Sequence, residues 1–158
     1  MKTTVLCLDE NLLDLNLLKY KFDELFGDTN ALLRWKNKLN ELSGKLSLVD
    51  KCNQINTLIF DALDSVANEH QKHLISYEKE HFLIRMSQLP LRKDVLSKIY
   101  QSEKEGYQIK IVTSKSSESL ISKFSNAGAE SLMKYLVHSN DLTTTNTAYE
   151  VLDRKIAS

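Results

Sequence analysis

The sequence predicts an α/β protein in which a parallel sheet is interrupted, after its first strand, by a helical insertion. Residues 3–8, TTVLCL, form a short apolar run with β-branched residues at its start, and residues 107–113, YQIKIVT, alternate between polar and apolar side chains. Between these two segments, apolar residues recur every three or four positions, which is typical of amphipathic helices. Strands that alternate with helical segments pair in parallel, so this order predicts the fold class.

The composition indicates one globular core. Of the 158 residues, 42% are hydrophobic and 27% are charged, a balance that supports a buried core and not a disordered chain. The 21 basic and 21 acidic residues cancel, so no overall field attracts nucleic acid or an anionic membrane. The apolar runs are too short to span a bilayer, and no signal peptide is recognisable. We therefore expect a cytoplasmic protein with neither nucleic acid nor a membrane as a partner.

Four helices are expected in the insertion. Gly27 ends the first helix, residues 28–30 offer capping side chains to the second, and Ser43-Gly44 ends the second. The expected ranges are Leu12–Phe26, Ala31–Leu42, Cys52–Val66 and His70–Met86.

Helices and strands alternate after Pro90, which is the only proline and marks a boundary. The expected elements are a helix over Asp94–Glu105, a strand over Tyr107–Thr113, a helix over Ser116–Asn126, a strand over Tyr135–Val137 and a helix over Thr147–Ala157. The sheet core is therefore expected to comprise residues 1–14 and 89–158, and the insertion residues 15–88.

The segment 4–15, TVLCLDENLLDL, resembles the opening loop of the haloacid-dehalogenase-type (HAD) hydrolases, D-x-N-x-T-L-L-D-L. Aligned without gaps, residues 12–15 fall on L-L-D-L and Cys7 falls on the nucleophilic aspartate. The segments 111–116, 126–128 and 137–139 continue the resemblance in the family's order. The resemblance is to the dehalogenase-type branch. It implies a short Rossmannoid sheet of about three strands with the insertion as a helical cap.

The resemblance also implies a chemistry. In the family an aspartate forms a covalent ester with the substrate, and a Ser or Thr after the second strand holds the substrate's anionic group. Thr113 takes this second role, with Ser114 beside it, although threonine is also ordinary at a strand end. The family's charge-balancing lysine is missing, since its position falls on Thr143. The final acidic motif, which binds Mg²⁺ in phosphatases, has no counterpart before Ser158.

Cys7 and Asp9 both admit two interpretations. A thiolate at Cys7 can act as a nucleophile when a neighbouring cation or helix N-terminus lowers its pKa, but a cysteine between two leucines is also a common apolar filler. Asp9 lies where phosphatases of the family keep a general acid, and a two-residue shift of the loop makes it the nucleophile. Otherwise, Asp9 simply belongs to a solvated turn.

Two further groups of residues are candidate sites. Arg34 lies where dehalogenases place substrate-facing residues and is a candidate clamp for a carboxylate, while the neighbouring Trp35 is expected in the core. His70 and His73, three residues apart on an expected helix, resemble a metal-ligand pair that Glu69 or Glu80 would extend. Surface helices rich in charged residues give the same pattern, so no metal site is expected.

We therefore expect a HAD-like pseudoenzyme that acts through binding or protein–protein contact, with a small anion at Thr113 and Ser114. The alternative is an active hydrolase, a 2-haloacid dehalogenase or a phosphatase, that uses Asp9 or Cys7. No cofactor is expected, except Mg²⁺ if the phosphatase alternative holds. Without further strands beside it, strand 3–8 would form an apolar edge. Such an edge predicts a homodimer or another protein partner there.

Overall fold

The computed structural model describes residues 2–141 and 149–150. The chain divides into two compact units, which we call the sheet unit (Met1–Asp14 with Pro90–Ser158) and the helical unit (Leu15–Leu89). Each unit has its own buried core, and the two are described separately below.

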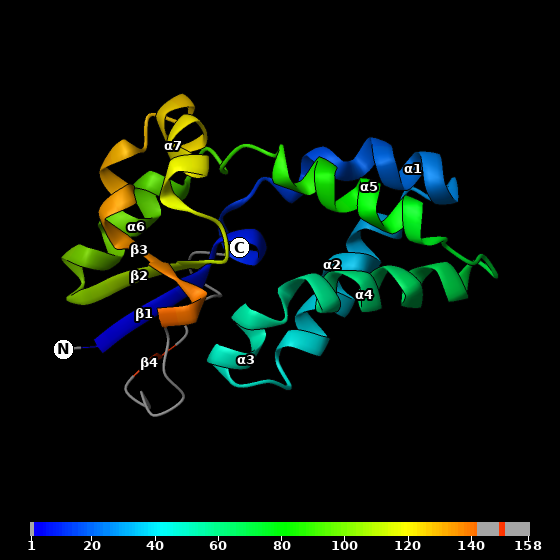
Figure 1. Cartoon of the computed structure of the whole chain (residues 1–158), viewed down its shortest axis with the longest axis horizontal. Coiled ribbons are helices and arrows are strands. Elements are labelled where there is room, and N and C mark those ends of the chain that lie inside the picture. The colour runs from blue at the N-terminus through cyan, green and yellow to red at the C-terminus, as the bar shows by residue number, and fades with distance from the viewer. Residues whose placement is uncertain (1, 142–148, 151–158) are drawn as a thin grey trace. The chain divides into compact units, whose positions relative to one another are not determined.

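The sheet unit is built on parallel strands, β1 (Lys2–Cys7), β2 (Tyr107–Thr113) and β3 (Leu136–His138), with the short strand β4 (Tyr149–Glu150). Their order is β3-β2-β1-β4, and Figure 1 shows β1 beside β2 along its length. The pairing runs from Lys2 opposite Tyr107 to Cys7 opposite Val112, which brings the carboxyl ends of β1 and β2 together. This sheet confirms the predicted α/β fold class.

β4 corrects two expectations about the end of the sequence. Tyr149 and Glu150 pair with Thr3 and Thr4, so these two residues form a strand and not part of a helix. The rest of the expected helix, Thr147–Ala157, lies outside the described residues. The upstream half of β1 is therefore not an open edge, because its backbone pairs with β4. If residues 149–150 were helical, the backbone N–H and C=O groups on this side of Thr3 and Thr4 would lack this strand partner.

The helices of the sheet unit follow the predicted pattern closely. α6 (Val95–Lys104) buries Val95 and Ile99, and α7 (Ser117–Asn126) buries Leu120 and Phe124. The hydroxyl oxygen of Ser116 caps α7 by accepting a hydrogen bond from the Ser119 N–H at 3.3 Å. Short 3₁₀ turns over Glu130–Tyr135 and Ser139–Asp141 flank β3.

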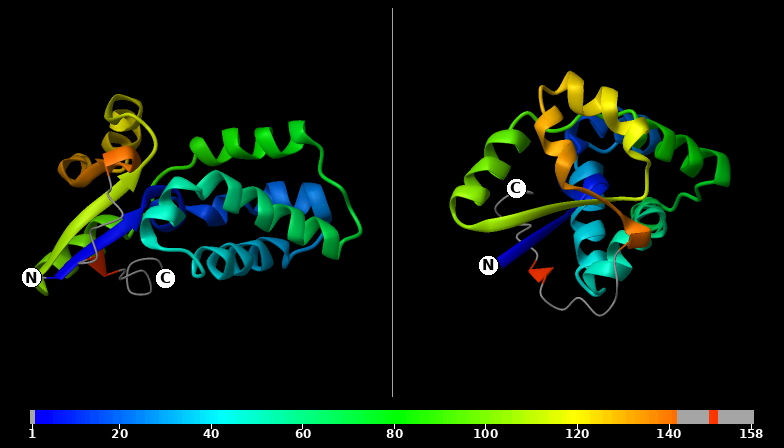
Figure 2. Two further views of the ribbon diagram at one scale, coloured as in Figure 1. Left: turned by 60° about the horizontal axis from the view of Figure 1, so that its bottom comes forward. Right: turned by 60° about the vertical axis from the view of Figure 1, so that its left-hand side comes forward.

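The helical unit contains one 3₁₀ turn (Leu15–Leu18) and five α-helices. They are α1 (Lys19–Phe26), α2 (Ala31–Ser43), α3 (Leu48–Asn53), α4 (Ile55–Glu69) and α5 (Ser76–Ser87). Figure 2 shows α1, α2, α4 and α5 side by side with roughly aligned axes. The helix expected over Cys52–Val66 is divided between α3 and α4, and residues 70–75 form a connection, not the start of a helix.

Three aromatic side chains form the centre of the helical unit. Phe22, Trp35 and Phe82, from α1, α2 and α5, have no exposed surface, and their ring centroids lie 5.4–5.5 Å apart. The indole N–H of Trp35 also donates to the Ile59 carbonyl of α4 at 3.4 Å. Trp35 therefore belongs to the core, as predicted. Within the residues that the structure describes, no helix is long and apolar enough to cross a bilayer.

Candidate anion site at the carboxyl ends of β1 and β2

The chain after β1 forms a single turn of π-helix over Leu8–Leu12. The Cys7 N–H donates to the side-chain oxygen of Asn11 at 2.8 Å, and both residues are buried. Cys7 is only 4% exposed at the position that the family resemblance assigns to the nucleophile. π-Turns are rare and often mark functional sites, because they change the direction of side chains over a short segment.

The far end of this turn is fixed by the chain returning to the sheet. The Arg92 N–H donates to the Leu12 carbonyl at 2.8 Å, and the Asp14 N–H donates to the Pro90 carbonyl at 2.9 Å. Leu13 and Leu91 form an antiparallel bridge between these two bonds. The loop that carries Asp9 is therefore held at both ends by backbone hydrogen bonds within the sheet unit.

Thr113 and Ser114 end the neighbouring strand in different ways. The Thr113 side chain is 5% exposed, and its hydroxyl oxygen accepts a hydrogen bond from the Lys115 N–H at 3.0 Å. Ser114 is exposed, and its carbonyl oxygen lies 3.1 Å from Nε2 of His138. The hydroxyl of Thr113 thus stabilises the turn into α7, and that of Ser114 faces solvent.

Asp9 is the main electrostatic feature of this end of the sheet. Burial raises the pKa of the Asp9 carboxyl above its ordinary value of 3.8, and the charges of Lys115 and Lys123 act in the opposite direction. The pKa of Lys123 is lowered to about 8, first by burial and then by the charge of Lys115, against the opposing effect of Asp9. One carboxyl and two ammonium groups therefore interact beside the carboxyl ends of β1 and β2.

This cluster has the chemistry of an anion site. Its net charge is +1 when Asp9 is ionised and +2 when Asp9 is protonated, and a protonated carboxyl can donate a hydrogen bond to a bound anion. A divalent cation fits poorly here, because the positive charges of Lys115 and Lys123 already act on Asp9 and a cysteine stands in the first-strand position of the family's acidic residue. Among the described residues, no three His, Cys, Asp or Glu side chains are grouped to hold a metal ion.

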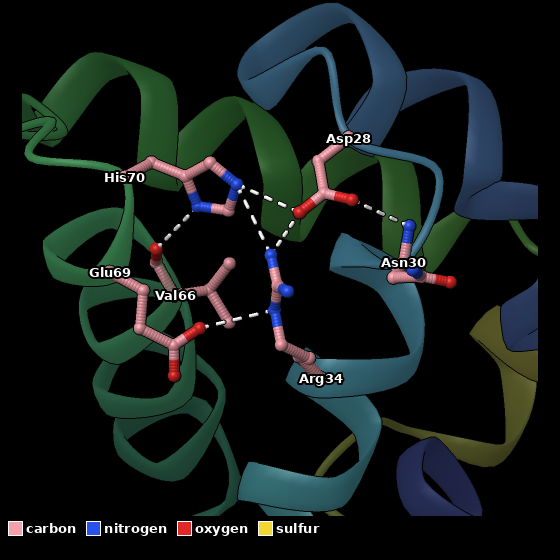
Figure 3. Close-up of polar contacts among 6 residues, drawn as sticks. All are labelled: Asp28, Asn30, Arg34, Val66, Glu69 and His70. Carbon is pink, nitrogen blue, oxygen red and sulfur yellow. Dashed lines mark hydrogen bonds and ion pairs between the residues drawn. The ribbon is translucent and has the colours of Figure 1, made fainter.

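Arg34, the predicted carboxylate clamp, lies in the helical unit and contacts two carboxylates of that unit (Figure 3). One guanidinium nitrogen bonds to Asp28, and Nε lies 3.1 Å from an oxygen of Glu69. The Nε–H is not aligned with that oxygen, so the second contact is an ion pair and not a hydrogen bond.

Arg34 also lines a shallow pocket of about 260 Å³ between α2 and α4. The remaining lining residues are Asn37, Lys38, Glu41, Ser65 and Glu69. Two cations and two anions line it, and Lys38 lies 3.5 Å from Glu41, so the pocket offers no net charge to attract an anion.

The sequence reasoning missed Lys115, Lys123 and Asn11. Lys115 was recognisable in principle, since it follows Thr113 by two residues at the strand's carboxyl end. Lys123 was not, because its charge reaches Asp9 only through the way α7 packs on the sheet. Asn11 falls on the family's threonine position, and the π-helical turn that brings its side-chain oxygen to the Cys7 N–H has no signature in the sequence.

No family model and no curated protein matches this sequence. Solved structures are similar to this chain, and the chain spans less than two thirds of the length of each of the following three. A dehalogenase with an intermediate complex is 16% identical over 89% of this chain and 63% of its own, with a TM-score of 0.53. The L-2-haloacid dehalogenase of Xanthobacter autotrophicus with chloropropionic acid covalently bound is 15% identical over 87% and 56%, with a TM-score of 0.55. A further dehalogenase is 16% identical over 87% and 61%, with a TM-score of 0.50. At such low identity the similarity establishes the fold alone: the chain has the α/β fold of the haloacid dehalogenase-like proteins, as the resemblance of residues 4–15 predicted.

Proposed function

We propose that this HAD-fold chain binds a small anion at the carboxyl ends of β1 and β2 and does not turn it over. The observation that carries the proposal is that the charges of Lys115 and Lys123 act on the partly buried carboxyl of Asp9, two residues after a buried cysteine at the nucleophile position. The lysines supply attraction, and Asp9 supplies a hydrogen-bonding group.

The buried Cys7 supports a binding role. In the enzymes that residues 4–15 resemble, a carboxylate at the end of β1 reaches the substrate, whereas the side chain at this position here is a cysteine only 4% exposed. A nucleophile must approach its substrate within van der Waals contact, which the burial of Cys7 disfavours.

Asp9 favours the second candidate function, an active hydrolase. A half-buried carboxyl near two ammonium groups has the surroundings of a catalytic acid, base or nucleophile. As a nucleophile towards a 2-haloacid, a carboxylate oxygen of Asp9 would attack the carbon that bears the halogen and release halide. Water would then hydrolyse the resulting ester.

Two measurements on one set of proteins test both candidates. Binding of sulfate, phosphate and 2-chloropropionate is measured by thermal shift and calorimetry. Halide release from 2-haloacids and phosphate release from phosphate esters are measured with and without Mg²⁺. The variants are Lys115→Gln, Lys123→Gln, Asp9→Asn, Cys7→Ala and Cys7→Asp, with Lys104→Gln, an exposed lysine of α6, as the matched control.

The binding proposal expects anion-dependent stabilisation in the wild type and in Lys104→Gln. Removal of either cluster lysine should weaken binding about tenfold, and no variant except Cys7→Asp should release product. Turnover by the wild type that Asp9→Asn abolishes would establish the hydrolase instead. Equal anion binding by Lys123→Gln and Lys104→Gln would rule out the site.

A further inference from the structure

A second group of charged side chains lies within the helical unit and joins three of its segments (Figure 3). Asp28 stands in the turn between α1 and α2, Arg34 lies on α2, and Glu69 and His70 lie at the end of α4. We call these four residues the Asp28–His70 clasp. It has no part in the anion site proposed above.

The ring of His70 meets a hydrogen-bond acceptor at each nitrogen. Nδ1 lies 2.9 Å from the Val66 carbonyl oxygen, and Nε2 lies 2.9 Å from Oδ2 of Asp28. A carbonyl and a carboxylate only accept, so each contact needs an N–H on the ring. A neutral imidazole carries one N–H and satisfies one contact, whereas the doubly protonated ring satisfies both.

The charges of the clasp agree with that reading. Two carboxylates, Asp28 and Glu69, face the single guanidinium of Arg34, and an imidazolium at His70 brings the total to zero. Hydrogen bonds from the Asn30 N–H, His70 and Arg34, together with the charge of Arg34, hold the pKa of Asp28 below its ordinary value against the opposing effect of desolvation. Asp28 therefore stays ionised in mildly acidic solution.

Removing one proton from His70 changes the contacts. Nη2 of Arg34 lies 3.2 Å from Nε2, so a ring without a proton on Nε2 can accept a hydrogen bond from Arg34. The same ring then turns a lone pair toward the Asp28 oxygen at 2.9 Å, and this contact becomes repulsive. The clasp therefore has two protonation states, one in which His70 donates to Asp28 and one in which this hydrogen bond is absent.

The other side chains near His70, Phe26 and Lys72, offer its ring no alternative hydrogen-bond partner. The Phe26 ring of α1 lies against the imidazole at 5.1 Å between centroids. The nearby cation of Lys72 donates to the Leu25 carbonyl at 2.6 Å and lies over the Phe26 ring. Directly after His70, the Lys72 N–H bonds to the Ala67 carbonyl at 2.8 Å and closes the end of α4.

We propose that His70 links the end of α4 to the α1–α2 turn in a proton-dependent way. Both of its hydrogen bonds form when the ring carries two protons, and the bond to Asp28 is lost when Nε2 is deprotonated. The sign of the pH dependence follows from the two partners. Because folding lowers the pKa of Asp28, this residue contributes its full stabilisation at pH values above its pKa in the unfolded chain. That stabilisation is lost as the pH falls through its pKa in the folded protein. Loss of the proton on Nε2 of His70 at higher pH removes the contact from the other side.

The test uses the only tryptophan, Trp35, as a reporter in the core of the helical unit. Urea unfolding is followed by Trp35 fluorescence at pH 5.5 and pH 8.5 for wild type, His70→Gln, Asp28→Asn and the double variant. His73→Gln, which replaces an exposed histidine of the same unit, is the matched control. We expect His70→Gln to raise the unfolding equilibrium constant about tenfold at pH 5.5 and by less than about twofold at pH 8.5, since the contact is charge-assisted but partly exposed.

The double variant decides whether Asp28 is the partner. Supporting data would show energetic coupling of His70→Gln and Asp28→Asn at pH 5.5 that disappears at pH 8.5, with His73→Gln unchanged at both. An equal effect of His70→Gln at the two pH values would overturn the proposal. The ring nitrogens of His70 are also observed in wild-type protein by ¹⁵N NMR at pH 5.5, in case a variant fails to fold. Two slowly exchanging ring N–H signals would support the proposal and a single one would refute it.

Discussion

Asp9 links the chemistry of the anion site to its stability. Its pKa is raised because burial disfavours the charged carboxylate more than Lys115 and Lys123 favour it. The folded protein therefore binds this proton more readily than the unfolded chain does. Stability is lost as the pH rises from the unfolded-state to the folded-state pKa of Asp9, and the loss persists at neutral pH.

We accordingly expect Asp9→Asn to stabilise the protein at pH 7, raising the unfolding midpoint by about 1–3 °C. The comparison is thermal unfolding of wild type, Asp9→Asn and Asp61→Asn, the last replacing an exposed aspartate of α4. A lower midpoint for Asp9→Asn would mean that attraction to the two lysines outweighs the cost of burial.

Lys123 should make anion binding sensitive to pH. Its pKa of about 8 means that the site loses a positive charge as the pH rises from 7 to 9. Sulfate keeps a constant charge over this range, so its affinity should fall as the pH increases. In Lys123→Gln the affinity should already be low at pH 7 and vary little; a parallel pH dependence in both proteins would argue against Lys123 as a ligand.

Gln71 has a backbone conformation that a side chain disfavours. Gln71 follows the end of α4, at a position where glycine is usual, and its φ of 55° lies in the left-handed region. Gln71→Gly should stabilise the protein by about 0.5–1 kcal/mol, because relief of about 1–2 kcal/mol of strain exceeds the added backbone entropy of glycine. Gln71→Val should destabilise it, and urea unfolding of the two variants compares the signs directly.

At the scale of secondary-structure elements, the helices of the helical unit pack around one aromatic residue, Trp35. Trp35 touches Phe22 and Phe82 and donates a hydrogen bond to α4. Trp35→Ala should destabilise the protein by about 3–5 kcal/mol, whereas Leu33→Ala, an exposed change on the same helix, should cost less than about 0.5 kcal/mol. Urea unfolding followed by circular dichroism measures both; a similar loss in the two variants would contradict a central role for Trp35.

At the scale of the whole molecule, the two units let one ligand experiment report on each part. An anion bound in the sheet unit should slow hydrogen exchange in β2 and α7 and leave amides around Trp35 in the helical unit less affected. Hydrogen exchange with and without sulfate measures this difference. Uniform protection of both units would indicate that the anion acts elsewhere or that the units open together.

Self-association remains a prediction. It was based on an open first strand, and β4 now covers Thr3 and Thr4 of that strand. Within residues 2–141 and 149–150, the pairing of β1 with β4 extends over Thr3 and Thr4. Sedimentation at micromolar concentration distinguishes a dimer from a monomer.

The α/β class, the HAD-like resemblance and most of the elements were predictable from the amino-acid order, because they depend on local periodicity and on motifs within short segments. The strand Tyr107–Thr113 was predicted with its observed bounds, and the break at Gln54 and the strand at Tyr149 were not. Three relations required the folded structure: Lys123 acts on Asp9, Asn11 binds the Cys7 backbone, and Arg34 contacts Asp28 and Glu69. Those relations join residues far apart on the chain or turned by a π-helical loop, and their distances are set by how the elements pack, which no local pattern encodes.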